Sequence, residues 1–145
     1  MATDSRSFPR VPKSALAARE FVRGTLEEMS PGLDPAKKDT AVLLADELVT
    51  NAIVHTLAKT FEVEVDVGAD YLRISVSDTA RSRPSVRRPR PEDVHGRGLV
   101  VVNSLAREWG VEDGGQRTAG RKRVWFRLAA TSQRKAPDPD ENRGR

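Results

Sequence analysis

Two polar residues interrupt an apolar helical stretch, and their types suit magnesium and proton chemistry. Glu47 and Asn51 lie four positions apart in AVLLADELVTNAIVH, so a helix places them on one stripe. An Asn oxygen is a hard metal ligand without charge, and a Glu can accept a proton or orient a hydroxyl. The pair would suit a magnesium-triphosphate site. Because the motif is short, the motif alone favours a structural role, in which both side chains hydrogen-bond to loops at the core edge.

A third candidate lies at the end of a strand pattern. Asp78 continues the alternation of Leu72, Ile74 and Val76, which places its carboxylate at the end of a core-facing row. There it would accept a hydrogen bond from a polar ligand edge such as an exocyclic amine. The alternative is an Asp that closes a turn through its own backbone.

A glycine pair forms the fourth candidate. Gly96, Arg97 and Gly98 precede the apolar stretch LVVVNSLA. If that stretch is a helix, its first N–H groups, its dipole and the guanidinium would attract phosphate. A G-x-G alone is weak, and an ordinary Gly-rich helix start is the alternative.

Apolar periodicity defines the elements that must position these residues. It predicts an α+β domain, a two-layer sandwich with three helices on one face of an antiparallel-rich mixed sheet. The first helix begins at Ser14 and ends near Ser30; the second begins at Pro35, with Asp34 as N-cap, and runs to about Thr56. The third covers 98–107. Period-2 runs predict two hairpins, 61–67 with 72–76 and 109–111 with 124–128.

The remaining segments divide the chain. Residues 1–12 contain two prolines and permit at most a short edge strand. Residues 13–130 form the predicted domain, interrupted by a Pro- and Arg-rich loop at 79–95. Residues 131–145 are almost without apolar side chains, so we expect a disordered polar tail.

Composition excludes several classes of protein. The 145 residues include no Cys and two His, which excludes disulfides and thiolate chemistry and disfavours zinc. The chain has no long apolar run and a polar start, so we expect a cytoplasmic protein without membrane contact. Residues 14–78 hold 6 basic and 12 acidic side chains, whereas 79–127 hold 12 and 5. Because the Arg-rich loop 81–90 has no aromatic residue, direct nucleic-acid binding is not expected.

The order of these motifs resembles a known family. ELVTNAIVH (47–55), VSDTARSRPSVR (76–87), GRGLVVVNSLAREWGV (96–111) and RVWFRL (123–128) are similar to motifs of the GHKL superfamily of histidine-kinase-like ATPases. More narrowly, the chain resembles anti-sigma factor serine/threonine kinases and their actinobacterial relatives over residues 8–130. The resemblance implies the Bergerat ATP-binding fold.

The resemblance also implies roles for the candidate residues. Asn51 would coordinate Mg²⁺ on the phosphates of ATP, Glu47 would be the general base, and Asp78 would accept the adenine amine's hydrogen bond. The loop 79–95 would be the ATP lid. The phosphates would be held by the segment Gly96, Arg97, Gly98 and Leu99.

Two positions depart from the family pattern. Ala80 stands where the superfamily usually has the Gly of Asp-x-Gly, and its methyl group could weaken nucleotide binding. Arg123 stands where a small hydroxyl residue usually faces the base. It would either remove a water-mediated contact or point outward.

The implied function is an ATP-binding regulator. The leading hypothesis is an anti-sigma-factor-like protein that binds a sigma factor and phosphorylates a Ser or Thr of an anti-anti-sigma partner. The alternative is a catalytically silent module that controls a transcription regulator with ATP, or without nucleotide. Because related domains commonly dimerise, a homodimer is a further option.

Overall fold

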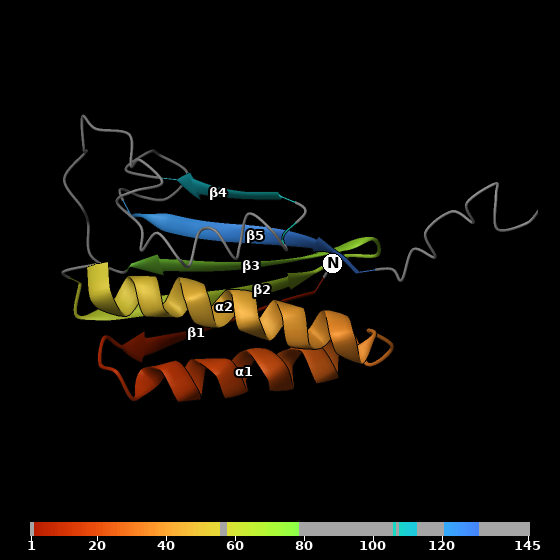
Figure 1. The fold of residues 1–145 in the computed structure, drawn as a ribbon, viewed down its shortest axis with the longest axis horizontal. Coiled ribbons are helices and arrows are strands. Elements are labelled where there is room, and N and C mark those ends of the chain that lie inside the picture. The colour runs from red at the N-terminus through yellow and green to blue at the C-terminus, as the bar shows by residue number, and fades with distance from the viewer. Residues whose placement is uncertain (1, 56–57, 79–105, 107, 113–120, 131–145) are drawn as a thin grey trace, which may run out of the picture.

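The chain folds into a five-stranded sheet with two helices packed on one face (Figure 1). The computed structural model describes residues 2–55, 58–78, 106, 108–112 and 121–130. The elements, in chain order, are β1 (Ala2–Pro9), α1 (Ser14–Met29), α2 (Pro35–His55), β2 (Thr60–Val67), β3 (Tyr71–Asp78), β4 (Glu108–Glu112) and β5 (Arg123–Ala129). This arrangement confirms the α+β class.

The sheet has the strand order β1-β2-β3-β5-β4, and all four pairings are antiparallel. Both predicted hairpin pairings are confirmed. The expectation of a mixed sheet is wrong for the described strands, because each of them pairs in the antiparallel sense. Of the three expected helices the described residues contain two, and the third, over 98–107, lies outside them except for Ala106, which is not helical.

The two helices begin and end where the sequence predicted. At the start of α2, the carboxylate of Asp34 accepts the backbone N–H of Ala36 at 3.0 Å, as expected of an N-cap. The carbonyl of Asp34 also accepts the N–H of Lys38 at 3.0 Å, which closes the first turn. These bonds, with proline at the first helical position, fix where α2 starts.

The N-terminal strand is longer than the sequence suggested. β1 has eight residues and pairs with β2 in an unbroken register from Ala2↔Val67 to Pro9↔Thr60. Proline disrupts only the last position, which an edge strand tolerates. The strand is anchored by Phe8, whose ring stacks on Phe61 with centroids 5.6 Å apart.

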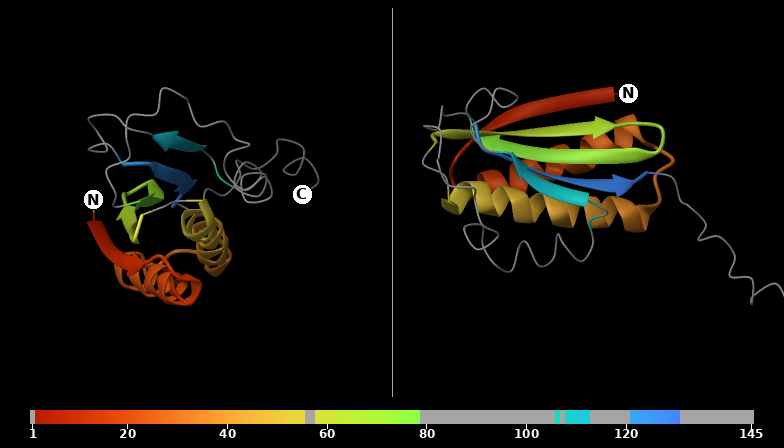
Figure 2. Two further views of the ribbon diagram at one scale, coloured as in Figure 1. Left: turned by 90° about the vertical axis from the view of Figure 1, so that its left-hand side faces the viewer. Right: turned by 90° about the horizontal axis from the view of Figure 1, so that it is seen from above.

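The core lies between the sheet and the two helices. Figure 2 shows both helices on the same face of the sheet, so alternate strand residues point toward them. The buried strand residues include Phe61, Ile74 and Phe126, each 0% exposed. Lys37, at the start of α2, donates its Nζ to the carbonyl of Ala129 at 2.9 Å and ties this helix to the end of β5.

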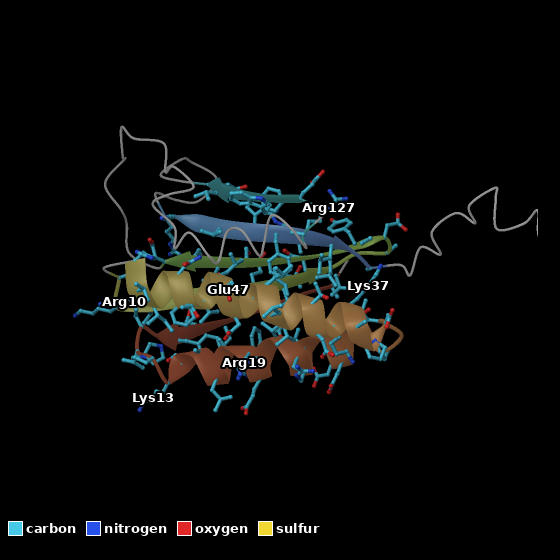
Figure 3. All side chains as sticks on the ribbon, viewed as in Figure 1. Arg10, Lys13, Arg19, Lys37, Glu47 and Arg127 are labelled. Carbon is cyan, nitrogen blue, oxygen red and sulfur yellow. The ribbon has the colours of Figure 1, made fainter. Side chains whose placement is uncertain are left out.

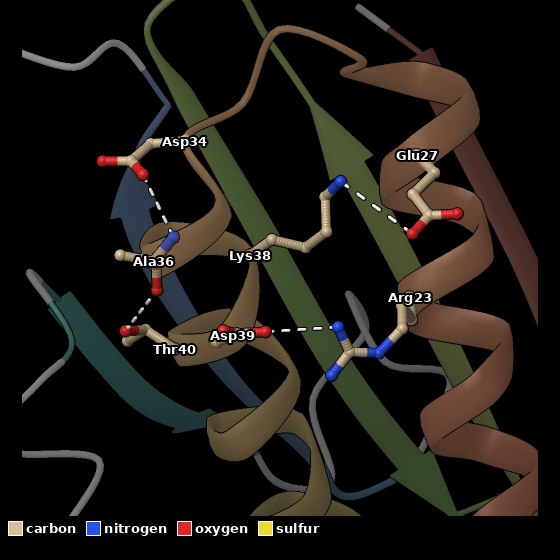
Figure 4. A network of polar contacts seen from close by, with 7 residues as sticks. All are labelled: Arg23, Glu27, Asp34, Ala36, Lys38, Asp39 and Thr40. Atoms are coloured by element: carbon tan, nitrogen blue, oxygen red, sulfur yellow. Dashed lines mark hydrogen bonds and ion pairs between the residues drawn. The ribbon is translucent and has the colours of Figure 1, made fainter.

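Ion pairs join the two helices along their shared side (Figure 4). Arg23 contacts Asp39 at 3.2 Å and Lys38 contacts Glu27 at 4.0 Å. One turn before Arg23, Arg19 contacts Asp46 of α2 at 3.1 Å. Exposed pairs of this kind contribute about 0.2–1 kcal/mol each. They nevertheless show that the cations of α1 turn toward α2.

The face of the sheet opposite the helices carries an aromatic and cationic layer. The Arg73 guanidinium lies 4.7 Å from the centroid of the Trp125 ring and also contacts Glu112 at 3.5 Å. Trp125 pairs with Gly110 on β4. A Cβ at Gly110 would lie 2.9 Å from Cζ2 of that ring. Glycine at this position therefore lets the indole lie across β4.

We expect Gly110→Ala to lower the free energy of unfolding by about 1–3 kcal/mol, because the added methyl group overpacks the Trp125 ring. The matched control is Gly24→Ala on α1, where no atom lies within 4 Å of the added Cβ. That change should stabilise the protein by up to about 1 kcal/mol, since alanine favours a helix interior. Urea unfolding of both variants measures the difference, and equal effects would contradict the packing argument.

A second prediction concerns Glu64, which lies on the same outer face. Burial raises its pKa above the ordinary value. The like charge of Asp66 and a hydrogen bond that protonated Glu64 donates to the Asp66 carboxylate add to the rise in pKa, and Arg123 opposes it. Ionised Glu64 therefore destabilises the folded chain as pH rises.

We expect Glu64→Gln to raise the melting temperature at pH 7, with a gain that disappears below about pH 4, where the native carboxyl is protonated in both folded and unfolded chains. Thermal unfolding across this pH range measures the effect. If the gain in melting temperature persists at low pH, it arises from packing of the glutamine side chain rather than from loss of the charge.

Neither described helix is long and apolar enough to cross a membrane. The predicted lid at 79–95 and the polar tail at 131–145 lie outside the described residues.

Candidate functional site

A small pocket opens where the last turns of α2 meet the ends of β3 and β5. Two of the candidates from the sequence, Asn51 and Asp78, line it. Figure 1 shows why they meet: the C-terminal ends of α2 and β3 lie at the same side of the molecule. The full lining among the described residues is Leu48, Asn51, Ala52, His55, Val76, Asp78, Lys122 and Val124.

Asn51 continues the core-facing stripe of α2. Leu44 and Leu48 lie on this stripe and are 0% and 1% exposed, and Asn51 follows three residues later at 5%. Neither its Nδ2 nor its Oδ1 has a hydrogen-bond partner among the described residues. A buried amide without partners costs about 1–3 kcal/mol. Among the described residues, the side chain of Asn51 thus has one oxygen acceptor and an NH₂ group with two donors that are available to a ligand.

Asp78 ends the inward row of β3, as the alternation predicted. It is 8% exposed, and the register pairs it with Phe61 of β2. Its backbone N–H donates to the carbonyl of Lys122 at 3.1 Å, which joins the ends of β3 and β5 at the pocket. The carboxylate therefore faces the pocket from a fixed strand end.

The C-terminal turn of α2 is held by Arg10, which follows β1. Its Nε donates to the carbonyl of Ala58 at 2.6 Å and its Nη1 to the carbonyl of Ile53 at 3.1 Å. A cation at a helix C-terminus also interacts favourably with the helix dipole. Arg10 thereby fixes the turn that carries Asn51 and His55 into the pocket.

Glu47 lies one turn before Asn51 but is not part of the pocket lining. It is half-buried, near the middle of α2, and is labelled in Figure 3. Leu43, one turn before Glu47, and Val54, two turns after it, are 46% and 59% exposed. The structure therefore places Glu47 beside the pocket on the more exposed side of the helix.

Two lining residues were missed in the sequence. His55 follows Asn51 by four positions and so shares its stripe, a signal that the spacing contained. Lys122 precedes the buried Val124 by two positions, so strand alternation places it on the pocket side.

The same alternation decides whether Arg123 faces the pocket or the opposite side of the sheet. Val124 is buried against the core, so the adjacent Arg123 belongs to the opposite face of the sheet. Its charge acts there on Glu64. Arg123 points outward, and Lys122 occupies the pocket-side position.

The predicted phosphate-binding segment, Gly96, Arg97, Gly98 and Leu99, lies outside the described residues, as does Ala80. The structure therefore brings together Asn51 and Asp78, with Glu47 nearby, and leaves this segment as an expectation.

The chemistry of the pocket fits a metal-nucleotide ligand in its donor set. Asn51 offers an oxygen that has no partner among the described residues, and Asp78 offers a carboxylate. Among the described residues, no three His, Asp or Glu side chains gather closely enough to hold a metal ion alone. Mg²⁺ commonly takes one or two protein ligands plus phosphates and waters, so this donor set suits it. The space that the described lining residues leave is about 20 Å³, enough for a water molecule.

Comparison with known families identifies the family of the chain. The chain belongs to the histidine kinase-like ATPase domain family, whose match covers residues 8–127. The match includes α1, α2, β2, β3 and β4 in full, together with the end of β1 and the greater part of β5.

Among solved structures, the chain is similar to the crystal structure of the RsbU and RsbW domains of Rv1364c from Mycobacterium tuberculosis. The TM-score is 0.64 at 21% sequence identity. The match covers 88% of this chain and 32% of that one, so this chain spans about a third of its length. No curated protein matches the chain.

Proposed function

We propose that the chain binds Mg-ATP at the α2–β3–β5 pocket and acts as an anti-sigma-factor-like regulator that phosphorylates a Ser or Thr of an anti-anti-sigma partner. The observation that carries the nucleotide site is the buried Asn51 amide, which has no partner among the described residues. Membership of the histidine kinase-like ATPase family supports ATP as the ligand.

Each residue has a proposed role. Asp78 accepts a hydrogen bond from the adenine amine, which explains a buried carboxylate at a strand end. Asn51 donates its amide oxygen to Mg²⁺, and the ion, when bound, neutralises phosphate charge. Glu47, half-buried on the same helix, accepts the proton of the partner's hydroxyl. The segment 96–99 holds the phosphates in this proposal.

The second candidate is a module that binds a partner without catalysis. Glu47 is not among the described residues that line the pocket, and the space that they leave is about 20 Å³. In that case the fold controls partner affinity, with or without ATP, and no phosphoryl group is transferred. A sigma factor is the proposed partner in both cases.

Calorimetric titration with Mg-ATP tests the nucleotide site. We expect the native protein to bind, Asp78→Ala to lose binding, and Asn51→Ala to bind more weakly, because each change removes a proposed contact. Circular dichroism of each variant controls for folding. If the folded native protein releases no heat at millimolar ATP, the proposed nucleotide site is wrong. The second candidate would then remain, as a module that binds its partner without nucleotide.

A further inference from the structure

A second open surface lies on the other side of the molecule, along the free edge of β1. Among the described strands, β1 has a neighbour only on its β2 side. Residues 2–7 are all exposed, and the register with β2 contains no bulge. An edge strand of this kind presents unpaired backbone N–H and C=O groups to which another strand can bind.

A groove of about 360 Å³ runs beside this edge, between β1 and α1. Its floor includes Phe21, which is 7% exposed. The Arg6 guanidinium lies 5.0 Å from the centroid of that ring. The Phe21 ring therefore already contacts one cation of the chain itself.

The charges of the groove are mainly negative. Glu20 and Glu28 from α1 and Asp4 from β1 line it, with Arg6 as the single cation among the described lining residues. The cations Arg19 and Arg23 of the same helix turn instead toward α2, where they pair with carboxylates. Arg19, Arg23 and Glu27 thus face α2, whereas Glu20 and Glu28 remain on the groove side.

We propose that the β1 edge and this groove, here called the β1–α1 groove, bind an extended basic segment of a partner protein as an added strand. Backbone hydrogen bonds to β1 would hold the segment. Every second side chain of an added strand points to the helix-covered face and so into the groove. Lys or Arg there would meet Glu20 and Glu28.

A second copy of this chain is a poorer occupant. Antiparallel pairing of two β1 strands about Ser5 would place Asp4 opposite Arg6 of the other copy. The same arrangement would place both α1 helices on one face, with Glu20 and Glu28 of each copy turned toward those of the other. Like charges at such an interface are unfavourable, so the charge pattern favours a basic partner.

Fluorescence anisotropy with an eight-residue peptide of alternating Lys and Val tests the proposal, with alternating Glu and Val as the control peptide. The native protein should bind only the basic peptide. In Glu20→Lys/Glu28→Lys the affinity should fall at least about tenfold, since two attractive contacts become repulsive. The matched control, Glu62→Lys/Asp70→Lys, makes the same change of net charge away from the groove and should retain the affinity.

Two measurements separate strand addition from general charge attraction. N-methylation of the odd residues removes the backbone N–H donors along one edge of the extended peptide, and N-methylation of the even residues removes those along the other edge. Only the edge that pairs with β1 needs its donors, so one of the two peptides should fail to bind. Equal loss in both charge variants, or binding of both methylated peptides, would overturn the proposal. Sedimentation that shows a dimer through β1 would overturn it in favour of a second copy.

The nucleotide site has a separate test. Asp78→Ala, which should lose Mg-ATP, is expected to bind the basic peptide as the native protein does. Failure of one proposal is therefore distinguishable from failure of the other.

Discussion

Asn51→Leu is expected to make the ligand-free protein more stable while it removes nucleotide binding. The native amide is 5% exposed, and both of its polar atoms lack partners among the described residues. A leucine of similar size would remove a desolvation cost of about 1–3 kcal/mol. For a chain of this length, the melting temperature should rise by about 3–9 °C.

Thermal unfolding without ligand and calorimetry with Mg-ATP measure the two effects. The control is Thr50→Leu, one position earlier on the exposed side of α2, where neither stability nor binding should change much. A lower melting temperature in Asn51→Leu would mean that the amide is satisfied in the whole chain. In that case Asn51 would serve the stability of the fold rather than the binding of a ligand.

Glu47→Gln is expected to abolish phosphoryl transfer while the affinity for ATP stays within about twofold. Glutamine keeps the size of the side chain but cannot accept a proton, and a general base contributes about 10²–10⁴-fold to a rate. Glu47 is outside the pocket lining, so its loss should leave nucleotide contacts intact. Single-turnover transfer of labelled phosphate from ATP to an anti-anti-sigma protein measures the rate.

Glu62→Gln is the matched control, because it makes the same chemical change on the outer face of β2 and should leave the rate unaltered. Unchanged transfer in Glu47→Gln would remove this residue from catalysis. Loss of ATP affinity in parallel with the rate would make it a binding residue. Absence of transfer in the native protein would favour the silent module.

Local signals were sufficient for much of the fold. Asp34 and Pro35 mark the start of α2, and the cap bond is present at 3.0 Å. The period-2 runs predicted both described hairpin pairings and the inward position of Asp78. These features depend on residues close together in the sequence, so they can be predicted from the sequence of one protein.

Long-range features were harder to predict. The length of β1 depends on its pairing with β2, and Phe8 reaches the core only through contact with Phe61. Lys122 was not predicted as a site residue, because the family pattern places the residue that faces the base at the next position, Arg123. A shift of one position along a strand exchanges the two faces of a sheet.

The strand order has a consequence for how the pocket is assembled during synthesis. β1, α1, α2, β2 and β3 are contiguous in the chain, so their contacts can form before β5 has been made. β5 must then pair with β3 across the whole segment between Asp78 and Arg123, which carries a loop-closure entropy. Lys122 and Val124 come with that last strand. A nascent chain that ends before Lys122 would therefore have Asn51 and Asp78 but an incomplete pocket. Ligand binding would then follow the pairing of β5 with β3 and would stabilise the completed sheet.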